Sequence, residues 1–191
     1  MIVRSMRENT MMAVLIVGAT LLALSTEPVA RAAGPVTVTR VVSPEKALRF
    51  EVIVPASLEQ VWAAFTTTEG LATWLWRDTR VDARPGGDWL AIFPQSTAGG
   101  TIISLTPKAT LVIAASAPDK FPTVRKEHTR ATFEFSALSA DSTKVTLVQT
   151  EWKAGDEWDA AYEYLAAGNA ELLTQLYQRF VSGPLVWPKG R

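Results

Sequence analysis

The 191-residue sequence contains no cysteine and only one histidine, His128. Without cysteine, the chain can form no disulfide bond, thiolate metal site or cysteine nucleophile. A single histidine cannot build a zinc site that needs several ligands, and no nucleophile-elbow motif accompanies it. We therefore interpret His128 as a solvated residue of a polar loop. We assign no metal site, no cofactor and no catalytic residues.

An excess of charge of one sign is also lacking. Lys and Arg number 19, Asp and Glu also number 19, and no basic run stands out. Binding to a nucleic-acid backbone depends on clustered basic residues, so we expect no nucleic-acid partner. The hydrophobic fraction of 48% and the charged fraction of 20% are typical of a globular domain, and the length suits one domain with an extension.

The first 33 residues have the pattern of a secretory signal peptide. Arg4 and Arg7 precede an uncharged apolar stretch over residues 11–25, and the small-residue sequence Ala30-Arg31-Ala32-Ala33 follows. The apolar stretch is shorter than the ~20 residues that a membrane-spanning helix needs. We predict cleavage of residues 1–33, export to the periplasm or outside the cell, and no membrane association afterwards.

Two alternatives remain for this segment. It could stay attached as an uncleaved membrane anchor. A translation start at Met11 or Met12 would remove the basic residues and weaken the prediction of export.

An alternating strand and a capped helix open the expected domain. Residues 48–54 place apolar side chains on one face and charged ones on the other, which is typical of a half-buried strand. Ser57 and Gln60 form a capping box, which predicts a helix start. Residues 58–65 carry one apolar stripe at helical spacing, and a second short helical turn covers residues 71–75.

Short segments of alternating hydrophobicity follow, separated by turns rich in glycine and proline. We predict strands over residues 80–84, 89–93, 101–106, 110–116, 131–136 and 144–152. Residues 117–130 predict a polar loop that contains His128. A further edge strand could form over residues 36–42.

A long helix ends the chain, from about Asp156 to the break at Gly183-Pro184. Its apolar residues form one broad face: Trp158, Tyr162, Leu165, Leu172, Leu173, Leu176 and Phe180. Strands gathered between short helices and one long helix favour an antiparallel α+β domain, in which the sheet curls around the long helix. We predict a leader over residues 34–46, the domain over 47–182 and a tail over 183–191.

Several motifs occur in an order known from one superfamily. They are Val54-Pro55-Ala56-Ser57 with Val61-Trp62 and Phe65-Thr66, then Leu71 to Trp76, Arg84-Pro85-Gly86-Gly87 with Trp89, Thr143 to Leu147, and Gly168 with Leu172, Leu173 and Leu176. Together they resemble the SRPBCC or START-like superfamily, also called helix-grip. Within it they resemble the branch named for an activator of a heat-shock chaperone ATPase.

The resemblance implies a curved antiparallel sheet of about six to seven strands around the long helix, with two short helices after the first strand. It also implies a cavity that, in relatives, holds lipids, steroids, polyketides or other apolar molecules. Asn169 departs from the pattern, because many members carry Trp there. Predicted export is a second departure from a mostly cytoplasmic branch, so chaperone activation is not carried over as a function.

Asn169 is the most informative single residue because it points with the apolar face of the long helix. A buried amide without a partner costs about 1–3 kcal/mol, so we predict that it hydrogen-bonds a ligand. A bond to backbone or water at a helix irregularity is the alternative. Tyr162 lies on the same face, and Tyr164 lies nearly opposite. The predicted ligand-binding residues are Asn169, Tyr162, Trp62, Trp74, Trp89, Phe93, Phe133, Phe135, Leu165 and Leu172.

The leading functional hypothesis is an exported protein that binds a small apolar, lipid- or polyketide-like molecule. The alternatives are an enzyme on the same scaffold, of cyclase, dehydratase or hydrolase type, and a protein-interaction module that uses the convex face of the sheet. Glu151 is a candidate base for the enzyme, or else a solvated rim residue. The oligomeric state stays open.

Overall fold

The structure, a computed structural model, describes residues 35–187. The predicted signal peptide lies outside this range. Eight strands form the sheet of the described part: β1 (Thr37–Val41), β2 (Ala47–Val54), β3 (Thr79–Val81), β4 (Asp88–Phe93), β5 (Ser96–Thr106), β6 (Thr110–Ser116), β7 (Thr129–Ser139) and β8 (Ser142–Thr150). Its helices are α1 (Leu58–Thr66), α2 (Thr68–Ala72), α3 (Pro122–Glu127) and α4 (Asp156–Ser182).

All neighbouring strands of the sheet are antiparallel, in the order β1-β2-β8-β7-β6-β5-β4-β3. The expected edge strand forms as β1 within the predicted leader, where Thr37 pairs with Glu51 and Val41 with Ala47. It brings the sheet to eight strands rather than six or seven, and the strand predicted over residues 80–84 is present as the three-residue β3.

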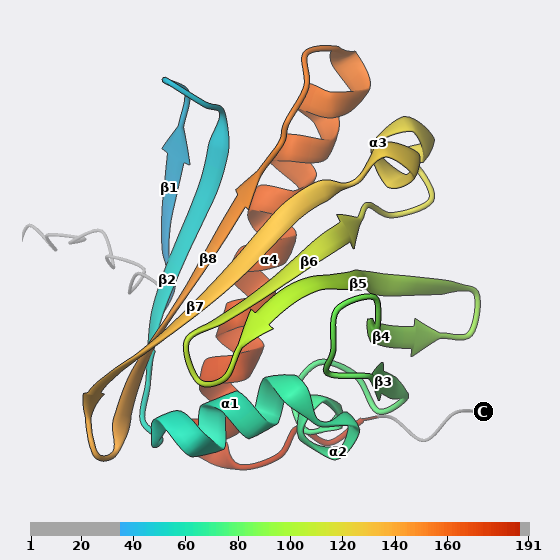
Figure 1. Ribbon diagram of the computed structural model, residues 1–191. Coiled ribbons are helices and arrows are strands. Elements are labelled where there is room, and N and C mark those ends of the chain that lie inside the picture. Colours follow the sequence, from blue (N-terminus) through green and yellow to red (C-terminus); the bar gives the residue numbers. More distant parts are fainter. Residues whose placement is uncertain (1–34, 188–191) are drawn as a thin grey trace, which may run out of the picture. The chain divides into compact units, whose positions relative to one another are not determined.

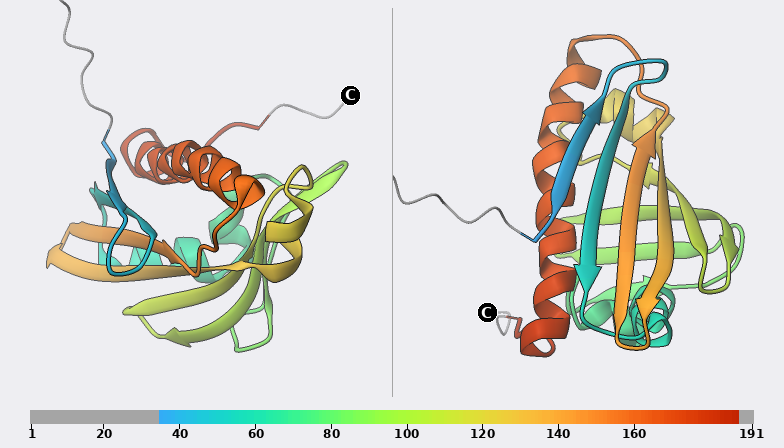
Figure 2. Two further views of the ribbon diagram at one scale, coloured as in Figure 1. Left: turned by 90° about the horizontal axis from the view of Figure 1, so that it is seen from above. Right: turned by 90° about the vertical axis from the view of Figure 1, so that its left-hand side faces the viewer.

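The sheet curves, and α4 lies across its concave side (Figure 2). Helices α1 and α2 follow β2 and cover one end of the sheet, while α3 lies toward the other end (Figure 1). This is the predicted α+β helix-grip arrangement, and it is confirmed. It arises because the alternating strands and the long helix each carry one apolar face, and wrapping buries both.

The ends of the predicted helices have clear local causes. The capping box of α1 is present, with the Ser57 hydroxyl accepting from Gln60 N at 3.3 Å and Gln60 Oε1 accepting from Ser57 N at 3.1 Å. Helix α4 begins at Asp156, directly after Gly155, and ends before Gly183, whose φ of 92° favours glycine.

The segment predicted as a loop over residues 117–130 contains a helix, so that part of the prediction is wrong. Pro122 takes the first position of α3, where its missing N–H costs nothing. Val124 is fully buried and packs α3 onto α4 together with Trp158 and Ala161. The helix has a single buried residue, which is too little periodicity to reveal it in the sequence.

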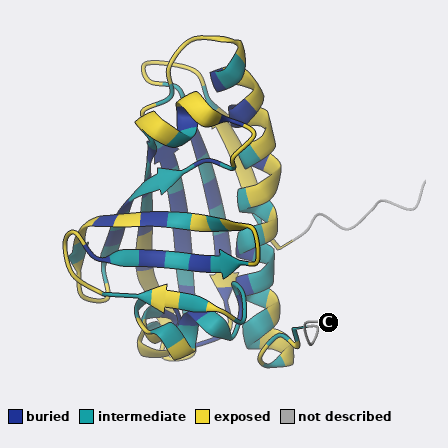
Figure 3. Cartoon of the chain, turned by 90° about the vertical axis from the view of Figure 1, so that its right-hand side faces the viewer, coloured by how far each residue is buried: buried dark blue, intermediate teal, exposed yellow. Residues whose placement is uncertain are grey.

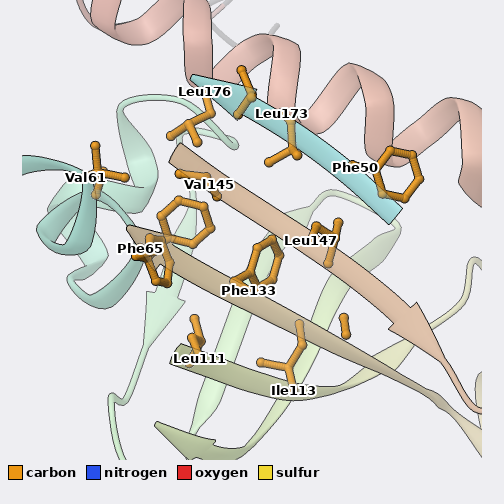
Figure 4. Close-up of a cluster of buried hydrophobic side chains, with 14 of the residues drawn as sticks. Phe50, Val61, Phe65, Leu111, Ile113, Phe133, Val145, Leu147, Leu173 and Leu176 are labelled. Carbon is orange, nitrogen blue, oxygen red and sulfur yellow. The ribbon is translucent and has the colours of Figure 1, made fainter. Parts of the chain in front are cut away.

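The core lies between the inner face of the sheet, α1 and the second half of α4 (Figure 4). Phe65 from α1 is fully buried at its centre, and its ring lies 4.9 Å from that of Phe135 and 5.1 Å from that of Phe133. Burial follows the concave side of the central strands, and the exposed residues lie mainly on turns and outer faces (Figure 3). Within residues 35–187, no helix combines the length and apolar character needed to cross a membrane.

Candidate functional site: an apolar cavity between the sheet and the long helix

A cavity of about 570 Å³ lies between the middle of α4 and strands β4 to β8. This volume is within the range of roughly 300–1,000 Å³ found for small-molecule sites. Five deeply buried apolar residues form most of its inner wall: Trp89, Ile113, Ala131, Phe133 and Leu147. The protein's own aromatic residues therefore do not fill the interior of the grip.

One polar network interrupts the apolar wall, and we call it the amide network. Asn169 Nδ2 donates to Gln149 Oε1 at 2.7 Å, and Gln149 Nε2 donates to Thr129 Oγ1 at 2.7 Å. Gln149 is 3% exposed and Thr129 is 1% exposed. Asn169 and Gln149 line the cavity. Within the described part of the chain, no group donates to Asn169 Oδ1. An acceptor atom thus remains available at the cavity wall.

The entrance of the cavity is defined by its exposed lining residues: Ser96, Ala98, Asp119, Lys120, Tyr164 and Gly168. They come from the start of β5, the segment between β6 and α3, and α4. The entrance therefore lies between the start of β5, the segment that joins β6 to α3, and one face of α4.

Six of the predicted ligand-binding residues line the cavity: Asn169, Trp89, Phe93, Phe133, Leu165 and Leu172. Trp89 has its polar atom satisfied elsewhere, because its Nε1 donates to Phe65 O at 2.8 Å. It therefore presents only an apolar surface to the cavity.

The other four predicted residues lie outside the lining. Trp74 is fully buried and donates from Nε1 to Ala64 O at 2.9 Å. Trp62 packs edge-on against Phe135 in the core, with ring centroids 5.3 Å apart. Tyr162 is 4% exposed and donates its hydroxyl hydrogen to Ala47 O on β2 at 3.0 Å. Burial raises the pKa of this hydroxyl, which is already engaged by the backbone.

Sequence reasoning missed Tyr164 and Gly168 as lining residues. The sequence analysis assigned α4 one broad apolar face. In the structure, one face of the helix packs against the protein and another lines the cavity. Trp158, Tyr162 and Leu173 belong to the face that packs on protein. The cavity face comprises Tyr164, Leu165, Gly168, Asn169 and Leu172. The spacing of i, i+4 and i+8 from Tyr164 through Gly168 to Leu172 is the signal that could have found them.

Few ionisable groups reach the cavity. Among the described lining residues, only Asp119, Lys120 and Tyr164 carry an ionisable side chain. Glu151, the candidate base, lies outside the lining and pairs with Arg130, with Glu151 Oε1 2.6 Å from Arg130 Nε. Within residues 35–187, no three acidic or histidine side chains cluster so as to hold a metal ion.

Glu157, in the first turn of α4, fixes α3 close to the entrance. Its Oε1 accepts from Thr123 N at 2.6 Å and from Val124 N at 3.1 Å, at the beginning of α3. Burial opposes the charge of this carboxylate, but the hydrogen bonds from α3 outweigh it and hold the pKa of Glu157 below its usual range.

We expect Glu157→Gln to lower the thermal unfolding midpoint at neutral pH. A carboxyl group with a lowered folded pKa stabilises the fold above its unfolded pKa, and this stabilisation is lost as the pH falls through the folded pKa. The difference from wild type should therefore shrink on acidification. Unfolding curves measured across the acid range check this, with Asp156→Asn as a neighbouring control. An unchanged difference at all pH values would contradict the proposed role of the charge.

Comparison with known proteins places the chain in a family. Residues 55–180 match the family described as Activator of Hsp90 ATPase homolog 1-like protein, and this match covers more than half of the chain. The chain belongs to this family, which lies within the SRPBCC helix-grip class. No curated protein gave a significant match.

Solved structures share the fold at low sequence identity. The Aha1 dimer from Colwellia psychrerythraea is 19% identical with a TM-score of 0.59, covering 72% of this chain and 97% of that one. A protein from Mesorhizobium loti is 16% identical with a TM-score of 0.60, covering 73% and 99%. DynU16, from the dynemicin biosynthetic locus, is 18% identical with a TM-score of 0.56, covering 74% of this chain and 49% of that one.

Proposed function

We propose that this protein is exported and binds a small, mainly apolar molecule in the cavity between α4 and the sheet. The observation that carries the proposal is a cavity of about 570 Å³ whose inner wall is apolar except for the amide network. Binding sites for small molecules commonly combine apolar walls with a few polar groups that orient the guest. The link of DynU16 to a biosynthetic locus supports a small-molecule role for the shared scaffold.

The chemistry of the lining favours binding over catalysis. Deep in the cavity, the polar side chains are the amides of Asn169 and Gln149, which do not exchange protons near neutral pH. Asp119, the one carboxylate of the described lining, is exposed and pairs with Arg125, with Asp119 Oδ1 3.0 Å from Arg125 Nε. Neither the cavity amides nor Asp119 can therefore act as a desolvated general acid or base.

Export is proposed from the sequence alone. Residues 1–33 have the order of a secretory signal, with a basic start, an apolar stretch and a small-residue cleavage site. Comparing the mass of the mature protein from the native cell with that of the full chain tests it. A protein that keeps residues 1–33 would contradict a cleaved signal.

Asn169→Leu tests the amide network with a matched pair of probes, naphthol and its methyl ether. Naphthol can donate a hydrogen bond to Asn169 Oδ1, whereas the ether cannot. One neutral hydrogen bond contributes about 1 kcal/mol, so wild type should bind naphthol about fivefold more tightly than the ether. Asn169→Leu should abolish this preference without abolishing binding of the ether.

Isothermal titration calorimetry measures both affinities. The control is Gln178→Leu, which makes the same kind of change at an exposed position of α4 outside the cavity. It should bind like wild type. If neither probe binds wild type, the proposed function is wrong. If the preference survives in Asn169→Leu, Asn169 Oδ1 is not the acceptor of the naphthol hydrogen bond.

A further inference from the structure

The entrance carries a charge that the protein itself does not balance. Asp119 and Lys120 both lie there. Asp119 is compensated, because its Oδ1 lies 3.0 Å from Arg125 Nε. Arg125 is also fixed in place, since its Nη1 donates to Ala117 O at 2.6 Å and its Nη2 to Thr97 Oγ1 at 3.4 Å. The negative group at the entrance is therefore already neutralised.

Lys120 has no acidic partner among residues 35–187. Its Nζ lies 3.5 Å from the ring centroid of Tyr164 and 5.1 Å from that of Phe121. Cation–π contacts of this kind hold an ammonium group in place without neutralising it. Because Tyr164 also lines the cavity, the ammonium group is held at the entrance.

Three of the four acidic groups on the first half of α4 are engaged elsewhere, and the fourth, Asp156, lies outside the cavity lining. Glu157 accepts from the backbone of α3, Asp159 pairs with Lys46 and Glu163 pairs with Arg40. One positive charge therefore remains at the entrance. The hydroxyl groups of Ser96 and Ser116 line the same cavity and can donate hydrogen bonds to an anion.

We propose that the ligand is an amphiphilic carboxylate whose acidic group binds Lys120 at the entrance and whose hydrocarbon part lies against the apolar inner wall. This inference rests on the proposed function and specifies its ligand class. One lysine neutralises a singly charged carboxylate, whereas a phosphate monoester, with a charge of about −1.5 to −2 at pH 7, would keep part of its charge unpaired. An acidic group at the entrance also keeps its contact with water, so its burial cost is small.

Decanoate and its uncharged methyl ester test the proposal on wild type, Lys120→Met, Lys120→Arg and Lys126→Met. Lys126 is an exposed lysine of α3 outside the cavity lining, so its variant controls for net charge. Exposed ion pairs contribute up to about 1 kcal/mol, so Lys120→Met should weaken decanoate binding by about two- to fivefold. Binding of the ester should not change. Lys120→Arg should retain most of the affinity, and Lys126→Met should behave like wild type.

Salt provides a second readout. Binding of decanoate, but not of the ester, should weaken between low and high salt, because the contact at the entrance is screened. Two results would overturn the role of Lys120 but leave the cavity as a binding site. In the first, Lys120→Met loses affinity for the ester as much as for decanoate. In the second, Lys126→Met loses as much affinity for decanoate as Lys120→Met does. Failure of both probes to bind wild type would instead overturn the proposed function itself.

Discussion

Gly168→Leu is expected to weaken ligand binding strongly while making the fold more stable. Gly168 lies near the middle of the cavity face of α4, and a Cβ atom built there meets no other atom within 4 Å. Because Gly168 is an exposed lining residue at the entrance, we expect a leucine side chain there to narrow the cavity without a clash. Glycine inside a helix costs roughly 0.5–1 kcal/mol relative to alanine, so its replacement should also raise stability.

The expected sizes separate the two effects. Gly168→Ala should stabilise the fold by about 0.5–1 kcal/mol and leave most of the cavity open. Gly168→Leu should be at least as stable as wild type. It should also weaken binding of decanoate or naphthol more than about tenfold, since the added atoms take up space that the ligand needs. Thermal unfolding and calorimetric titration measure the two quantities. Retention of full affinity by Gly168→Leu would show that the ligand does not use this cavity.

Gln149→Met is expected to destabilise the fold on the order of 2 kcal/mol. Methionine keeps the approximate volume of glutamine but removes both polar atoms. Thr129 Oγ1 and Asn169 Nδ2 would each lose their hydrogen-bond partner, and an unpaired buried polar group costs about 1–3 kcal/mol. Denaturant unfolding measures the loss.

A double-mutant cycle tests whether the network, rather than packing, causes this loss. Thr129→Val alone leaves Gln149 Nε2 without its partner. In the variant that combines Gln149→Met with Thr129→Val, both polar groups are gone. It should therefore be about 1 kcal/mol more stable than the sum of the single changes predicts. Strict additivity would mean that the two side chains do not interact.

Much of the fold could be predicted because local patterns and long-range packing agree. The capping box at Ser57, the alternation over residues 48–54 and the apolar face of α4 all specify elements that the structure contains. Helix α3 was not predicted because it has only one buried residue, Val124. Its first N–H groups also donate to Glu157, which belongs to a helix far away in the sequence. Such contacts across the fold leave no local pattern.

The cavity was harder to predict than the fold. Spacing placed Asn169 on an inward face, but nothing in the sequence shows that its amide donates to Gln149, which in turn donates to Thr129. Tyr162 and Trp74 have the same apolar character as lining residues, yet backbone carbonyls from other elements engage their polar atoms and hold them in the core. Periodicity identifies inward-facing residues, but the curvature of the sheet determines which of them line the cavity and which pack in the core.

Native mass spectrometry of the protein purified from its own cellular compartment tests the central claim most directly. The account predicts an additional mass bound to wild type at a one-to-one ratio, identified after release as an apolar molecule with an acidic group. Gly168→Leu prepared in the same way should carry no such mass. A wild-type protein that is free of any guest, and that remains so after incubation with decanoate, would contradict the account.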